Sequence, residues 1–199
     1  MKIGKNIMLE SKLESTMKRF LKKDYIYLTI ITIFIILFYF ILTHGKYIYG
    51  STTDWKDQHF LFAEYFRNLF YYNHKLIPQF SLNIGAGQNI FNFAYYGLLN
   101  PIILISYFLP FLSMMDYIII SSLLIVIISS ILIYYWLKEN NYNSNICIFS
   151  TIIFVCSAPL IFHSHRHIMF MNYMPFLILG LIGIDSYFKN NKFFLITIS

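Results

Sequence analysis

The uncharged apolar run from Tyr25 to Thr43 is the feature that most limits what this chain can fold into. A membrane-spanning helix needs about 20 such residues, and this run supplies them. Seven of the fifteen basic residues precede it, at Lys2, Lys5, Lys12, Lys18, Arg19, Lys22 and Lys23. Because positive charge marks the cytoplasmic flank of a span, we predict a cytoplasmic N-terminus over 1–24 and a transmembrane helix over 25–43. No small-residue cleavage site follows, so we expect a retained signal anchor.

The composition excludes an ordinary soluble domain. The chain is 58% hydrophobic and 12% charged, whereas soluble domains carry about 25% charged residues. The same apolar content excludes disorder. Since the basic residues gather at the N-terminus, the net charge of +6 orients a membrane protein, and we expect a lipid bilayer and no nucleic acid as partner. Cys147 and Cys156 lie inside apolar runs, which argues against a disulfide framework or a zinc site.

Further apolar runs predict a polytopic, all-α transmembrane helix bundle. Three have the length of a span and a fourth is cut short, at 115–137, 146–162, 170–188 and 193–199. The connecting segments agree with a cytoplasmic N-terminus, because Lys138, Lys189 and Lys192 fall on the inside and Arg166 on the outside. Since the last run has only seven residues, we expect an incomplete fifth span and the front part of a longer membrane protein.

This topology places a long external loop over 44–114. From Phe60 to Tyr72, apolar residues recur at helical spacing, which predicts an amphipathic helix suited to the membrane surface. Its apolar face is Phe62, Phe66, Leu69 and Phe70, and its polar face is Asp57, Glu64, Arg67 and Asn68. We expect Glu64 and Arg67 to form a solvated i, i+3 pair.

A second apolar run, 93–111, contains Pro101 in its middle, where proline removes a helical hydrogen bond. We therefore predict a broken, re-entrant or interfacial segment and not a full span. The turn before it, Ser81–Asn89, lacks the Lys-Ser/Thr ending of a nucleotide phosphate loop, so nucleotide binding there is unsupported.

Asp54 is the leading candidate for chemistry in the loop. A carboxylate at the membrane surface could act as a general base or bind a divalent cation. Gln58 follows four residues later, where a helical turn would put both side chains on one face. The competing interpretation is structural, since Asp54 or Asp57 could be the N-cap of the amphipathic helix.

The predicted external turn between the third and fourth spans carries a second polar cluster, namely His163, His165, Arg166 and His167. Alternate histidines could bind a transition metal, or together with Arg166 could bind a phosphate or pyrophosphate headgroup. The plainer alternative is an exposed interfacial loop.

Several short segments resemble the YfhO family of bacterial multi-span membrane proteins. They are Thr53–His59, Phe80–Asn89, Tyr95–Pro101 and Met174–Gly180. The resemblance covers most of the chain from about residue 25 onward. It implies a glycosyltransferase-C-like architecture in the bacterial plasma membrane. Such proteins transfer a sugar from a polyprenyl-phosphate carrier to a cell-envelope polymer, such as teichoic acid, at the outer face.

The resemblance also implies roles for individual residues. In that architecture an acidic residue in the first external loop is catalytic or metal-linked, and the matching position is Asp54. Gln58 is then a substrate-binding candidate. Related transferases often carry acidic residues in the second external loop, but this chain has His163, His165, Arg166 and His167 there. We assign these four to the carrier phosphate and leave metal dependence open, with a divalent cation as the candidate cofactor.

Two other interpretations remain open at the level of sequence. A non-catalytic transporter, flippase or assembly subunit predicts functional charges within the spans, for which Asp116 and Asp185 are the candidates. An inactive truncated product is the other interpretation, suggested by the short final run.

Overall fold

A computed structural model describes residues 24–43, 50–77, 79–96 and 98–190, apart from the side chains of Thr52, Tyr95, His163, Met169 and Asn190. The basic residues before Asp24 and the predicted fifth span at 193–199 lie outside the described residues. The described elements are a first helix Asp24–Leu42, η1 (Thr52–His59), α2 (Phe60–Asn73), β1 (Phe80–Ser81), β2 (Gln88–Asn89), η2 (Ile90–Tyr96), α3 (Pro101–Ile105), η3 (Ser106–Phe108), α4 (Met114–Glu139), α5 (Ser144–Val155), α6 (Ala158–Arg166), α7 (Ile168–Asn172) and α8 (Met174–Asn190).

The protein is an all-α membrane helix bundle, apart from the small antiparallel pair β1–β2. Two helices in the described part of the chain are long and apolar enough to cross a bilayer, Asp24–Leu42 and α4. The run predicted as a helix over 146–162 is interrupted: α5 ends at Val155, α6 begins at Ala158, and the two are bent by 43°. The run 170–188 spans the end of α7, a turn at Tyr173 and most of α8.

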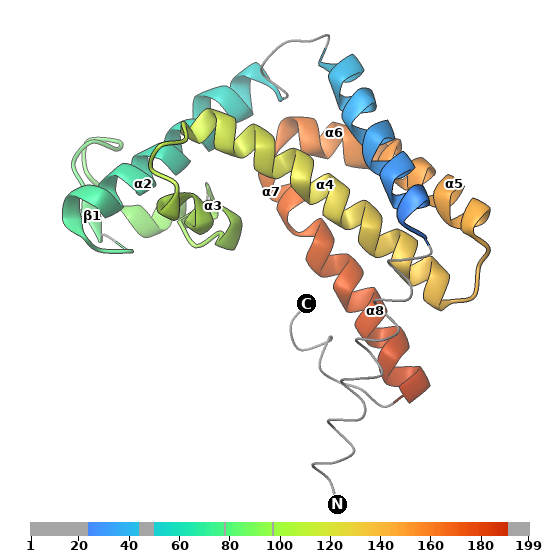
Figure 1. Cartoon of the computed structure of the whole chain (residues 1–199). Helices are drawn as coiled ribbons and strands as arrows, with labels where there is room; N and C mark the ends of the chain where they lie inside the picture. Colours follow the sequence, from blue (N-terminus) through green and yellow to red (C-terminus); the bar gives the residue numbers. More distant parts are fainter. Residues whose placement is uncertain (1–23, 44–49, 78, 97, 191–199) are drawn as a thin grey trace, which may run out of the picture.

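Helix α4 is the centre of the bundle, where it packs against α5 and α8 (Figure 1). The first helix lies against this core through one stripe, Ile31, Ile35 and Tyr39, with Ile31 and Ile35 almost fully buried. Its other faces expose large apolar side chains such as Phe40. An apolar surface of this kind suits contact with lipid.

At the end of α4 away from α2, polar side chains fasten α4 to α8. Trp136 Nε1 donates to Asp185 Oδ2 at 2.6 Å, and Asn140 Nδ2 donates to the same oxygen at 3.0 Å. Lys189 Nζ in turn donates to Asn140 Oδ1 at 2.7 Å. The Asp185 carboxylate therefore already has two hydrogen-bond donors from α4 and the residue that follows it. At the other end of α4, Ser113 caps the helix and Asp116 accepts the Ser113 hydroxyl.

Helix α2 confirms the predicted amphipathic helix and uses its apolar face for packing on protein. Phe66 is 1% exposed, and the Phe62 ring stacks on Tyr96 at 4.6 Å. The prediction for Arg67 is wrong: the side chain is 5% exposed and donates from Nη1 to the carbonyl oxygen of Leu112 at 3.0 Å. Arg67 thus turns inward to a backbone carbonyl instead of pairing with Glu64 in solvent.

The run 93–111 folds into the short helices η2, α3 and η3 instead of one long helix. Pro101 does not kink a helix; it occupies the first turn of α3, where its missing N–H costs nothing. Asn100 caps this helix, since its Oδ1 accepts from the backbone N–H of Ile102 at 2.9 Å. The sequence Asn-Pro thus starts a helix at this point and turns the chain back toward α4.

Candidate functional site

The site begins with η1, a π-helix in which backbone hydrogen bonds run from residue i to i+5. The N–H of Phe60 donates to the carbonyl oxygen of Trp55 in this pattern. Ser51 is its N-cap, because the Ser51 hydroxyl accepts from the Asp54 N–H at 3.1 Å. Neither Asp54 nor Asp57 is the cap, so the carboxylate of Asp54 is not used to close the helix.

Gly50 lets the chain enter this helix. Its φ of +141° is strained for any L side chain, and a Cβ there would collide with the Trp55 ring. Trp55 itself is 4% exposed and belongs to the core that includes α4. The start of the π-helix is thus fixed between a glycine turn and a buried tryptophan.

Asp54 and Arg166 meet across the site. Arg166 Nε lies 3.4 Å from Asp54 Oδ2, and the two side chains are 57% and 18% exposed, respectively. A backbone hydrogen bond of 2.8 Å from the N–H of Ser51 to the carbonyl oxygen of His165 holds the two segments in register. The ion pair therefore rests on a backbone connection between the start of η1 and the end of α6.

Gln58 turns to a different partner. Its Oε1 accepts from the Tyr96 hydroxyl at 2.6 Å. The Tyr96 ring also lies 5.4 Å from the ring of His59. Gln58 therefore connects η1 to η2 and lies next to the buried part of the site.

His59 and His167, which lies next to Arg166 in the sequence, form a hydrogen-bonded pair. Nε2 of His59 lies 3.2 Å from Nδ1 of His167, and His59 is 1% exposed. Burial lowers the pKa of His59 from 6.5 to about 4; His167 adds to this effect and Asp54 opposes it. His59 is thus neutral at physiological pH, so one ring donates and the other accepts.

The structure brings together four of the six predicted site residues. Asp54, Arg166 and His167 lie where η1 meets the end of α6, and Gln58 joins them through Tyr96 and His59. His165 contributes its backbone carbonyl, and its side chain is exposed. The side chain of His163 lies outside the described residues.

His59 was not among the predicted site residues, although it is only 1% exposed. An α-helix would place Gln58 one turn from Asp54. η1 is instead a π-helix, in which hydrogen bonds run from i to i+5, and His59 stands five residues after Asp54. Its Nδ1 has no hydrogen-bond partner among the described residues.

The described side chains do not form a metal site. No three His, Cys, Asp or Glu side chains in this part of the chain are grouped so that they could hold a metal ion. His59 and His167 each use one ring nitrogen in their mutual hydrogen bond. These two histidines are therefore arranged to bind each other.

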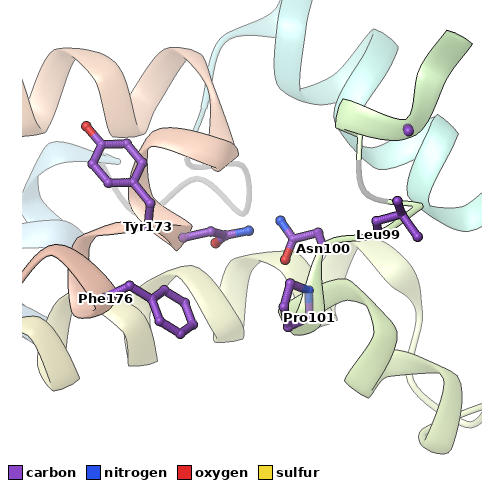
Figure 2. Close-up of a pocket in the computed structure, with 7 residues that line it drawn as sticks. Leu99, Asn100, Pro101, Tyr173 and Phe176 are labelled. Carbon is purple, nitrogen blue, oxygen red and sulfur yellow. The ribbon is translucent and has the colours of Figure 1, made fainter. Parts of the chain in front are cut away.

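The structure also contains a pocket of about 490 Å³, lined by other residues than this cluster. Figure 2 shows Leu99, Asn100 and Pro101 on one side and Tyr173 and Phe176 on the other. Ala94 and Asn172 complete its lining, so η2, α3, α7 and α8 all border it. None of these seven residues is charged.

The fold and the site together define a helical membrane protein with a charged and histidine-containing cluster and an uncharged pocket. The model of one family, described as bacterial membrane protein YfhO, matches residues 26–199. The chain belongs to this YfhO family. No curated protein and no solved structure matches it significantly.

Proposed function

We propose that this protein takes part in transferring a sugar from a polyprenyl-phosphate carrier to a cell-envelope polymer, such as teichoic acid, at the outer face of the bacterial plasma membrane. Membership of the YfhO family and the resemblance of that family to glycosyltransferase-C proteins support the reaction class. The observation that carries the proposal is the contact between Asp54 and Arg166, which pairs an acidic group and a phosphate-binding group in one site.

Asp54 acts on the acceptor. Its carboxylate is partly exposed and does not cap the helix, so it can accept a proton from an acceptor hydroxyl as that oxygen attacks the anomeric carbon. Attack from the face opposite the carrier inverts the configuration at that carbon. The bond to the carrier breaks, and the electron pair leaves with the polyprenyl phosphate.

Arg166 stabilises the departing phosphate. Its ion pair with Asp54 uses Nε, which leaves the two terminal nitrogens of the guanidinium to bind phosphate oxygens. The side chain is 57% exposed, so a membrane-anchored carrier can reach it. The ion pair also keeps Asp54 in position before substrates bind.

The His59–His167 pair helps to position Asp54 and Arg166. The hydrogen bond between His59 and His167 joins η1 to the residue after Arg166, and His59 itself is buried in its neutral form. Gln58 and Tyr96 extend the support toward η2. These residues are positioning residues for Asp54 and Arg166.

The transporter alternative has less support from the bundle. Asp185 is held by Trp136 and Asn140, and Asp116 is part of a helix cap. Coupling charges in transporters must change partners, whereas these two carboxylates have stable structural ones.

The decisive experiment replaces Asp54 in the protein as it is produced in its own membrane. Asp54→Asn keeps the side-chain volume and removes the charge. Membranes from a strain that carries this variant are assayed for transfer of radiolabelled sugar from polyprenyl phosphate to envelope polymer. We expect transfer to be abolished at wild-type protein levels.

Asp57→Asn is the matched control. Asp57 lies in the same helix, its side chain is exposed, and it forms no ion pair among the described residues. We expect it to keep normal transfer. Full transfer by Asp54→Asn, or equal losses in both variants, would contradict the role of Asp54.

A further inference from the structure

We propose that the pocket between Asn100 and Asn172 binds the neutral ring of the sugar that is transferred. The inference rests on the proposed function for the identity of the reaction, but it stands on separate residues. It assigns the uncharged pocket to the sugar and the Arg166 cluster to the phosphate.

Asn172 is the residue that points to a ligand. It lies at the C-terminal end of α7, is 6% exposed and lines the pocket. Neither its Nδ2 nor its Oδ1 has a hydrogen-bond partner among the described residues. A buried amide without partners is costly, and such groups are normally satisfied. A sugar hydroxyl can both donate to Oδ1 and accept from Nδ2.

Asn100 offers a second polar group from the opposite wall. Its Oδ1 is used by the cap of α3, so Nδ2 is the group left for a ligand. Figure 2 shows the Asn100 amide directed toward the side of the pocket that Tyr173 and Phe176 form. The two asparagines thus provide donors and an acceptor in a cavity that is otherwise apolar or aromatic.

The rest of the lining defines the chemical class. Small-ligand pockets measure about 300–1,000 Å³ and combine aromatic walls with a few placed polar groups, and this one has about 490 Å³. Phe176 and Tyr173 give an aromatic surface for the C–H face of a ring. With no charged residue in the lining, a phosphate or a sugar acid would lack a counter-charge.

The position of the pocket is consistent with a phosphate site at Arg166 and a sugar site between the two asparagines. His167 precedes α7 and Asn172 ends it, so five residues of helix, about 7.5 Å, separate the phosphate side from the sugar side. On the opposite wall, Tyr96 ends η2 beside His59, and Asn100 follows four residues later. A sugar phosphate can therefore extend from Arg166 toward the two asparagines.

The test measures binding of free sugars to the full chain in lipid nanodiscs by saturation-transfer difference NMR. Glucose, galactose and N-acetylglucosamine are the neutral probes, and glucuronate is the charged one. We expect saturation transfer to at least one neutral sugar and none to glucuronate. No transfer to any neutral sugar, or equal transfer to glucuronate, would overturn the proposal.

Two variants locate the binding to this pocket. Asn172→Leu removes the polar group at similar volume, and Asn100→Ser keeps an N-cap while removing the amide N–H donor. Each should weaken binding of the neutral sugar about tenfold, the ratio expected for one lost hydrogen bond. Asn172→Leu should also melt at the same or a higher temperature without sugar, because an unpaired buried amide is gone. Wild-type affinity in both variants would overturn the assignment.

A third variant separates this inference from the proposed function. Asp54→Asn should bind the neutral sugar as the wild type does. If the wild type binds the sugar but never transfers it, the proposed transferase function is rejected and the sugar-binding pocket is retained. Transfer that depends on Asp54 but not on Asn172 would reject the pocket alone.

Discussion

Asp54 and Arg166 are in contact, with Oδ2 and Nε 3.4 Å apart, although α2, α3, α4 and α5 lie between them in the sequence. The geometry of this pair differs from that of an exposed lysine bridge, because a guanidinium can hold a carboxylate through Nε and a phosphate through its other nitrogens.

Substitution of Arg166 should mainly affect use of the donor. We expect Arg166→Gln to raise the KM for the polyprenyl-phosphate sugar about tenfold. Arg166→Lys should recover part of this loss, because lysine restores the positive charge but not the two-pronged hydrogen bonding of the guanidinium. Steady-state transfer at varied donor concentration measures this. An unchanged KM in Arg166→Gln would place the phosphate elsewhere.

The buried histidine should make stability depend on pH. His59 has a pKa of about 4 in the folded protein against 6.5 when unfolded, so the unfolded chain binds more protons between these values. Stability should be full above pH 6.5 and fall as the pH drops toward 4. Melting temperatures in detergent, measured from neutral pH down to about pH 4.5, test this, and His59→Gln should show a flatter profile. A wild-type profile as flat as that of the variant would contradict the burial of His59 in its neutral form.

Tyr96→Phe should remove one hydrogen bond and leave Gln58 Oε1 without this donor. We expect a loss of about 1 kcal/mol in stability, and a reduced transfer rate because Gln58 supports η1. Tyr72→Phe is the control, since Tyr72 is 84% exposed. Equal thermal shifts in the two variants would show that the Tyr96 bond is unimportant.

Asp185→Asn should leave sugar transfer intact. The amide oxygen of the substituted side chain would still accept from Trp136 Nε1, so the fastening of α4 to α8 survives at reduced strength. Transfer activity normalised to protein level is the measurement. Loss of activity in a correctly folded Asp185→Asn variant would revive the transporter interpretation, in which this carboxylate has a functional charge.

The sequence was sufficient to predict those features that depend on local pattern. The uncharged run before Thr43 and the apolar spacing from Phe60 both became helices, and the resemblance of Thr53–His59 and its neighbours to the YfhO family was confirmed by the family match. Asp54 and Arg166 were both chosen as candidates, but only the fold could show that they touch.

The features that were missed depend on choices between competing local structures. η1 winds as a π-helix, and the buried His59, five residues after Asp54, was not among the predicted site residues. The local sequence around Arg67 is that of a surface residue. Its actual partner, the carbonyl oxygen of Leu112, is distant in the sequence and only the fold brings the two together. Asn172 lies in an apolar run, where nothing local distinguishes a buried amide that lacks partners from one that has them.

The hydrogen bond between His59 and His167 also sets an order in time. The two residues are 108 positions apart, and at about 5–20 residues per second the ribosome needs about 5–20 s to make the chain between them. During that interval α4 and α5 must be synthesised before His167 can reach its partner. Asp54 and Arg166 therefore come together late, after α4 and α5 have been made, and a nascent chain halted before the end of α6 would carry Asp54 without Arg166.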